Sequence, residues 1–410
     1  MEENKSEKFG VGEGPPFRLA VLASHPIQYQ APLFRSLSVR PDIELHVFFC
    51  CRFGLDRYMD PGFEVSFSWD IPLIDGYPRT FLNNLSLVPN PSHFWGLVNP
   101  GIVTPILRGG FDAIWIHGWS FATNLIAWAA ASITRLPILL RCETNGLSEP
   151  IGLKGALKRL ILSTFFSKVA GFLAIGTSNA HFYKSYGIPD KRIFLTPYTV
   201  DNLFFFNRAQ ALHDKKRLLR EKQGIPPDLP VILFCGKFHH NKRPFDLLKA
   251  YTLMNGRPTA SLVFVGDGPL RSEMEHFVAD KHLRNVCFLG FKNQQEMPTC
   301  YALADLLVLP SSSEPWGLVL NEAMCNGLPI IASDRVGAVA DLVRNGVNGY
   351  TYPVGDIEVL TERMQQIVGN EDARLEMGNR SRAIINRWGI EESVQGVLQS
   401  FEWIRSCWRQ

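Results

Sequence analysis

The chain has 410 residues, 46% hydrophobic and 20% charged, which suits two globular domains and excludes a disordered protein. Its formal net charge of +3 is too small to favour a nucleic-acid partner. Eight cysteines form no Cys-x-x-Cys pair, and this favours reduced core residues in a cytoplasmic protein. Residues 1–16 lack the apolar core of a signal peptide and are predicted to form a disordered tail.

Short apolar runs alternate with helical patterns along the first half of the chain. Residues 50–90 interrupt this alternation and are predicted to be a loop-rich surface excursion. The alternation is typical of a doubly wound parallel sheet, which we predict for a first domain over residues 17–205. The predicted strands are 18–24, 43–49, 111–117, 137–141, 171–175 and 192–196, and the predicted helices end near 38, 134, 168 and 186.

A polar segment with several prolines, residues 206–230, is predicted to link the first domain to a second one over 231–388. The second half repeats the α/β alternation of the first. A last apolar pattern predicts a helix within residues 389–410. The predicted strands are 231–235, 260–265, 286–289, 306–309 and 329–332, and the predicted helices are 244–254, 269–281, 294–303, one from Pro315, 356–368 and 370–387.

The segment 311–322, which follows the apolar strand 306–309, has the layout of an anion site. Pro315 suits the first position of a helix, so free backbone N–H groups are expected to point out of the carboxyl end of the strand. Glu314 and Glu322 flank them, roughly 10 Å apart along the helix, with Glu322 off its core-facing stripe. A ligand with hydroxyl groups at both ends and phosphates between them would fit this layout, and a nucleotide sugar is such a ligand. The alternative is an ordinary strand–turn–helix unit with Glu314 as a cap and Glu322 solvated.

The string Glu-Pro-Trp-Gly-Leu-Val-Leu-Asn-Glu at 314–322, followed by Cys-Asn-Gly-Leu-Pro-Ile-Ile-Ala-Ser, resembles a known signature. It is similar to the Glu-x7-Glu motif of retaining GT-B glycosyltransferases, specifically glycosyltransferase family 4 (group 1). The resemblance implies two Rossmann-like domains facing a central cleft, with the last helix crossing back to the first domain. It also implies hexosyl transfer from a nucleotide-sugar donor to a hydroxyl acceptor, with no metal or other cofactor. No Asp-x-Asp triplet occurs, which argues against a metal-dependent GT-A enzyme.

The resemblance also assigns roles to the residues of this motif. Glu322 is expected to hold the ribose hydroxyls, and Glu314 to contact the donor sugar near the reacting end. Backbone N–H groups are expected to meet sugar and phosphate oxygens and to stabilise the leaving diphosphate. The residues that would supply these N–H groups are Trp316, Gly317, Leu318 and Val319.

Two lysines follow the first strand of the second half. Gly236 allows close backbone approach, and Lys237 and Lys242 are placed to grip a diphosphate from two sides. The family pattern has arginine at the first of these positions, so Lys237 is a departure that keeps the charge and loses the bidentate fork. The alternative is a pair of surface lysines on a loop.

His117 ends a strand of the first half, where similar enzymes have a histidine that touches the donor sugar. We predict it to be catalytic together with Glu314 and Lys242, the alternative being a structural histidine. The loop 25–30 departs from the glycine-rich form common in the family, so phosphate contact from it is not expected. The weaker candidates, all for acceptor contact, are His25, Gln28, Tyr29 and Glu143.

A basic face at Lys154, Lys158, Arg159 and Lys168 lies beside Leu153, Leu157, Leu160 and Phe165. Peripheral contact with the inner face of a membrane is one interpretation, and an amphipathic helix with a solvated side is the favoured one. Two other functions stay open at this stage. They are a nucleotide-sugar-binding partner subunit without catalysis, and a GT-B phosphorylase or epimerase.

Overall fold

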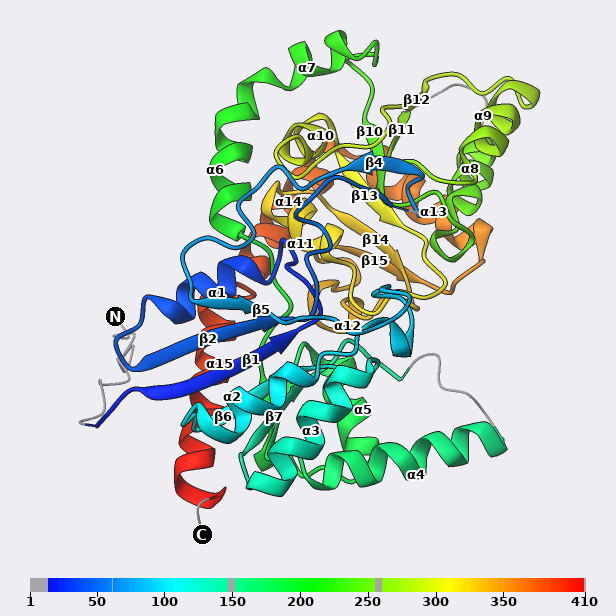
Figure 1. Ribbon diagram of the computed structural model, residues 1–410. Coiled ribbons are helices and arrows are strands. Elements are labelled where there is room, and N and C mark those ends of the chain that lie inside the picture. Colours follow the sequence, from blue (N-terminus) through cyan, green and yellow to red (C-terminus); the bar gives the residue numbers. More distant parts are fainter. Residues whose placement is uncertain (1–13, 61, 147–151, 255–259, 409–410) are drawn as a thin grey trace, which may run out of the picture.

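The computed structural model describes residues 14–60, 62–146, 152–254 and 260–408, and two parallel sheets organise it (Figure 1). The expected tail therefore lies outside the described residues, except for 14–16. The first sheet has seven strands and the second has six. In spatial order the first is β5 (Arg79–Phe81), β2 (Ile43–Phe49), β1 (Phe17–Ala23), β6 (Ala113–His117), β7 (Ile138–Arg141), β8 (Gly171–Ala174) and β9 (Ile193–Leu195), and the second is β12 (Val286–Phe288), β11 (Ser261–Val265), β10 (Val231–Cys235), β13 (Leu306–Leu309), β14 (Ile330–Ser333) and β15 (Gly349–Tyr352).

Both sheets place their strands in the same doubly wound order, which confirms the predicted fold class. The order reverses between β1 and β6 in the first sheet and between β10 and β13 in the second. Ligands of such sheets bind beyond the carboxyl ends of the strands at these reversals. The central strands of both sheets are nearly fully buried, because helices cover both faces of a parallel sheet.

The helices follow the predicted alternation with small shifts at their ends. Two elements of the second domain, β15 and α12, were not predicted. The helices of the first domain are α1 (Ala31–Ser38), α2 (Val103–Arg108), α3 (Ala122–Thr134), α4 (Leu153–Ser167) and α5 (Thr177–Ser185), and those of the second are α8 (Pro244–Leu253), α9 (Arg271–Asp280), α10 (Met297–Leu303), α11 (Leu318–Cys325), α12 (Val339–Leu342), α13 (Ile357–Val368) and α14 (Glu371–Ile385).

Three segments connect the two domains. The segment 206–230 is largely helical, because it holds most of α6 (Asn202–Leu212) and all of α7 (Lys216–Lys222), which pack on α10. The last helix, α15 (Ile390–Trp403), returns to the first sheet as expected: the ring of Phe401 stacks on Phe17 with centroids 3.9 Å apart. Residues 50–90 contain a short hairpin, β3 (Tyr58–Asp60) and β4 (Val65–Phe67), as well as β5.

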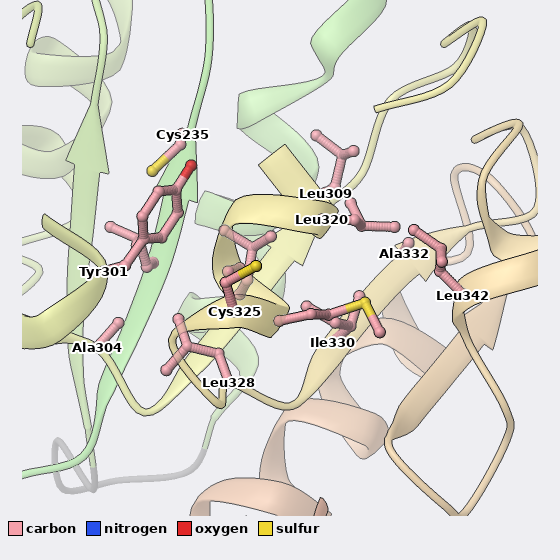
Figure 2. Packing of buried hydrophobic residues seen from close by; sticks show 14 of the residues in the cluster. Cys235, Tyr301, Ala304, Leu309, Leu320, Cys325, Leu328, Ile330, Ala332 and Leu342 are labelled. Carbon is pink, nitrogen blue, oxygen red and sulfur yellow. The ribbon is translucent and has the colours of Figure 1, made fainter. Parts of the chain in front are cut away.

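The core under α11 fixes the position of the 311–322 segment. Figure 2 shows side chains of β13, α11 and β14 packed in one cluster, with Leu309, Leu320 and Ile330 among them. Each of these three side chains is at most 1% exposed. Burying a leucine or isoleucine stabilises a fold by about 1.5–3 kcal/mol, so the start of α11 is held against its sheet. Among the described residues, no helix is both long and apolar enough to cross a membrane.

Candidate active site

A cavity of about 560 Å³ lies between the domains, beyond the carboxyl ends of β10 and β13. The strand reversal of the second sheet therefore opens into it. Both domains line this first cavity. The predicted residues that it brings together are Gln28, Tyr29, Glu143, Gly236, Lys237, Lys242, Glu314, Trp316, Gly317, Leu318, Val319 and Glu322.

The turn before α11 differs from the prediction. The helix begins at Leu318 and not near Pro315, because Glu314 forms a parallel bridge with Val336 and Gly317 adopts a left-handed φ of 100°. A Cβ at Gly317 would also meet Leu309 and Val336 at 3.1 Å, so glycine is needed for both shape and space. Gly317, Leu318 and Val319 at the start of α11 still line the cavity. The first N–H groups of a helix have no partner within the helix and are available to a ligand.

The side chain of Trp316 has a structural position. It is 3% exposed and donates from its indole nitrogen to Asn321 at 2.9 Å, and Asn321 donates in turn to the carbonyl of Tyr198 at 3.0 Å. This chain of bonds ties the start of α11 to the end of the first domain. Trp316 can therefore offer a ligand its backbone, while its ring packs between the domains.

Lys242 and Glu314 form an ion pair at the wall of the cavity. Lys242 comes from the loop after β10, and Glu314 from the segment after β13, so the strand reversal brings them together. Their side chains are only 20% and 15% exposed. The pair presents one partly buried cation and one anion next to the helix start, where an incoming anion can compete for the ammonium group.

Glu322 is buried, which contradicts the alternative in which it is a solvated residue of an ordinary strand–turn–helix unit. It is 8% exposed and accepts hydrogen bonds from the Tyr301 hydroxyl at 2.5 Å and from Gln294 at 3.3 Å. Burial raises the pKa of Glu322 to about 7, against the two hydrogen bonds, which lower it.

The second lysine, Lys237, is held by the first domain. Its ammonium group lies 2.8 Å from one carboxylate oxygen of Asp60 and 4.8 Å from the centre of the Phe63 ring. Asp60 also accepts from the N–H groups of Gly62 and Phe63. Burial opposes ionisation, yet Lys237 and these N–H groups keep the pKa of Asp60 below its ordinary value. The β3–β4 hairpin therefore reaches across the cleft to the loop after β10.

The same hairpin covers the loop at 290–292, which follows the carboxyl end of β12. The centroid of the Phe291 ring lies 4.4 Å from the centroid of the Phe67 ring and 5.0 Å from that of the Phe63 ring. A further interdomain bond runs from the side chain of Asn293 to the carbonyl of Ser68 at 2.7 Å. The hairpin is thus a wall of the cleft supplied by the first domain.

A second cavity of about 680 Å³ adjoins the first, beyond the carboxyl ends of β1, β6 and β7. His117 and His25 line this second cavity and not the first. His117 stacks on Trp115, and its Nδ1 lies 3.3 Å from the amide nitrogen of Gln30. Burial, with Arg141 nearby, lowers the pKa of His117 to about 3, and burial lowers the pKa of His25 to about 4. Both rings are therefore neutral at pH 7.

A carboxylate held by two tyrosines separates the cavities. Tyr198 and Tyr29 both donate to the same oxygen of Glu143, the latter at 3.3 Å, and all three residues line both cavities. Burial, and then the charge of Glu143, raise the pKa of both phenols well above its ordinary value, so both stay donors. Glu143 is thus positioned at the passage between the two spaces.

Several residues of the site were missed by sequence reasoning. Tyr301 and Gln294 come from α10 and the turn before it, and Asp60 from the hairpin. Tyr198 follows the carboxyl end of β9, a position that could have marked it as a candidate. Within the described ranges, no group of three or more His, Cys, Asp or Glu is arranged to hold a metal ion.

Comparison with known proteins identifies the second half of the chain. The sequence family described as Glycosyl transferases group 1 matches residues 215–384. This protein carries a glycosyl transferases group 1 domain. That domain spans all of the second sheet and the segment with Lys242, Glu314 and Glu322, so the motif lies where the family model matches.

Relatives of the group 1 domain share part of their length with this chain. The N-acetyl-alpha-D-glucosaminyl L-malate synthase of Bacillus anthracis is 30% identical over 195 residues, 47% of this chain and 49% of that protein. A sulfoquinovosyl transferase of Arabidopsis thaliana is 30% identical over 159 residues, 38% of this chain and 30% of that protein. The chain thus spans about half, or less, of the length of these two relatives.

Solved structures match over nearly the whole chain. A glycosyltransferase from Rickettsia africae has a TM-score of 0.74 at 15% identity and covers 96% of this chain and 99% of its own. An Anabaena protein in complex with UDP and glucose has a TM-score of 0.69 at 16% identity, with 94% and 99% covered. At these identities the likeness concerns the fold, which is GT-B.

Proposed function

We propose that this protein is a retaining, metal-independent glycosyltransferase that moves a sugar from a nucleotide-sugar donor to a hydroxyl acceptor. The donor would occupy the first cavity, with its diphosphate between Lys237, Lys242 and the start of α11. Glu322 would hold the ribose and Glu314 the sugar. The acceptor would enter the second cavity and reach the donor past Glu143. Within this chain, positive charge and helix N–H groups would stabilise the leaving diphosphate.

One observation carries this proposal. Lys242, Glu314, Glu322 and the first N–H groups of α11 line one interdomain cavity at the strand reversal of a sheet. Two relatives of the group 1 domain are named as sugar transferases or synthases, and one structural neighbour was solved with UDP and glucose. A front-face displacement, in which the leaving phosphate helps to deprotonate the acceptor, is the mechanism that the family resemblance implies.

The decisive experiment screens nucleoside diphosphates and their sugars by thermal shift, without added metal. A ligand present at a hundred times its dissociation constant should stabilise the fold by about 2.7 kcal/mol. The purified protein should then hydrolyse or transfer that donor at the same rate with and without EDTA, and the product should keep the anomeric configuration of the donor by NMR. Donor binding without any turnover would instead favour the non-catalytic partner subunit.

The pair between Asp60 and Lys237 makes a prediction about donor affinity. Asp60→Asn keeps an oxygen for the Gly62 and Phe63 N–H groups and removes the charge that competes for Lys237. An exposed or half-exposed ion pair is worth up to about 1 kcal/mol, so the donor dissociation constant should fall by about fivefold at most. Isothermal titration measures this. Weaker donor binding in the variant would show that Asp60 orients Lys237 for the donor.

Glu143 makes a separate prediction about the acceptor. Glu143→Gln keeps the size of the side chain but cannot accept an acceptor proton, so kcat should fall by about 100-fold or more. The donor dissociation constant should stay within about twofold of the wild-type value, because the carboxylate lies at the passage and not at the diphosphate. Tyr198→Phe, which removes one hydrogen bond to the same oxygen, is the matched control and should have a smaller effect on kcat.

A further inference from the structure

The outer side of α4 carries an apolar stripe. Leu157, Leu160 and Ile161 are between 58% and 67% exposed. Their spacing of three and four residues places them on one side of the helix. The other side buries Leu162 and Phe166 in the core of the first domain. Helix α4 is therefore apolar on two sides, and within the described part of the chain its outer side is left in solvent.

A second exposed apolar group lies on the loop at 85–95. Leu87, Val88 and Trp95 are between 71% and 100% exposed. Pro91 and Ser92 of this loop line the second cavity, as does Lys158 of α4. The two exposed groups thus flank one opening. We call Leu87, Val88, Trp95, Leu157, Leu160 and Ile161 the docking surface.

The region around the docking surface is positively charged. Residues 77–189 contain nine Lys or Arg and three Asp or Glu, a net +6, whereas the whole chain has +3. On α4 itself Lys158 is half-buried, while Arg159 and Lys168 are exposed. The part of the chain outside 77–189 is accordingly net negative. The segment around α4 has no acidic residue at all: residues 152–187 contain five Lys or Arg and no Asp or Glu.

We propose that the docking surface binds the headgroup region of an anionic lipid bilayer. Its apolar side chains would enter the headgroup boundary, its basic neighbours would meet lipid phosphates, and Trp95 has the amphipathic ring that such boundaries favour. Figure 1 shows α4 on the far side of the first domain from the second sheet, so docking leaves the cleft open. Lys158, Arg159 and Lys168 of this basic segment lie at or near the surface beside the exposed apolar side chains of α4, and this combination matches an anionic bilayer.

This placement has a consequence for the acceptor, which rests on the proposed function. The second cavity would open at the lipid headgroups, because its lining residues Ser92 and Lys158 lie beside the docking surface. The acceptor hydroxyl would then belong to a membrane lipid. A water-soluble acceptor would need no such surface around the opening.

Vesicle sedimentation with the full chain tests the proposal. The protein should bind vesicles of phosphatidylcholine with about 30% phosphatidylglycerol at least about tenfold more strongly than phosphatidylcholine alone, and 0.5 M salt should weaken the binding. Leu160→Glu with Ile161→Glu should reduce the binding to the anionic vesicles by about tenfold or more. Leu375→Glu, on the equally exposed surface of α14, should have no effect.

Two results would overturn the proposal. One is equal or absent binding to the two vesicle types. The other is a change of oligomeric state in the Leu160→Glu, Ile161→Glu variant by light scattering, which would make the surface a contact between two copies of the chain. The donor thermal shift is measured on the same variant and should match wild type. That readout separates a failure of the docking surface from a failure of the proposed transferase function.

Discussion

Replacing Lys242 by alanine should lower the rate of sugar transfer by about 100- to 1,000-fold, the effect of removing one well-placed donor to a developing negative charge. Lys242 pairs with Glu314 at the wall of the first cavity. Its loss would leave that carboxylate unpaired beside the leaving diphosphate. Steady-state kinetics with a saturating donor measure the change in kcat. Lys249→Ala, on an exposed position of α8, is the matched control and should keep the wild-type rate.

The double variant Lys242→Ala, Glu314→Ala separates two roles of Glu314. If Glu314 only balances the charge of Lys242, removing both should recover part of the lost activity. If Glu314 contacts the donor sugar, the double variant should be slower than either single one. A wild-type rate in Lys242→Ala would show that the donor diphosphate lies elsewhere.

The Glu322→Gln variant should be more stable than the wild type at alkaline pH and should bind the donor more weakly. Burial raises the pKa of Glu322 to about 7 from its ordinary value of 4.5. Between these two values the folded protein binds more protons than the unfolded chain, so the stability of the wild type falls as pH rises. This pKa shift corresponds to about 3 kcal/mol in the free energy of unfolding. The variant should therefore be more stable than the wild type by about this amount at pH 8, and the difference should nearly vanish at pH 4.

Chemical denaturation at the two pH values measures this difference, and donor titration measures the loss of binding. Hydrogen bonds to a charged group contribute about 1.5–3 kcal/mol, so the donor dissociation constant should rise by about 10- to 100-fold. Glu402→Gln, at an exposed position of α15, should change both quantities little. A stability gain that is the same at pH 4 and pH 8 would contradict the assigned ionisation of Glu322.

Much of the fold followed from local pattern. The apolar run at 306–309 and the polar turn after it predicted a buried strand that delivers a helix start to its carboxyl end, and β13 and α11 are arranged in this way. The start of α11 was misplaced by three residues, because the bridge between Glu314 and Val336 holds the chain extended past Pro315. That bridge joins residues 22 apart, and no periodicity within the segment reports it.

The composition of the site was harder to predict than its location. Parallel strands of one sheet end at a common edge, so residues that follow strand ends, such as Lys242 and Glu322, could be brought to one cleft from the sequence by itself. The pair of Asp60 with Lys237 joins positions 177 apart through a hairpin in an irregular excursion. The burial of Glu322 depends on Tyr301 from a neighbouring helix. The amino-acid sequence alone thus determined the fold and the cleft, through the strand–helix alternation and the residues at strand ends. Tertiary packing decided the ion pairs, the buried carboxyl group and the division into two cavities, because these depend on how the two domains and their loops meet.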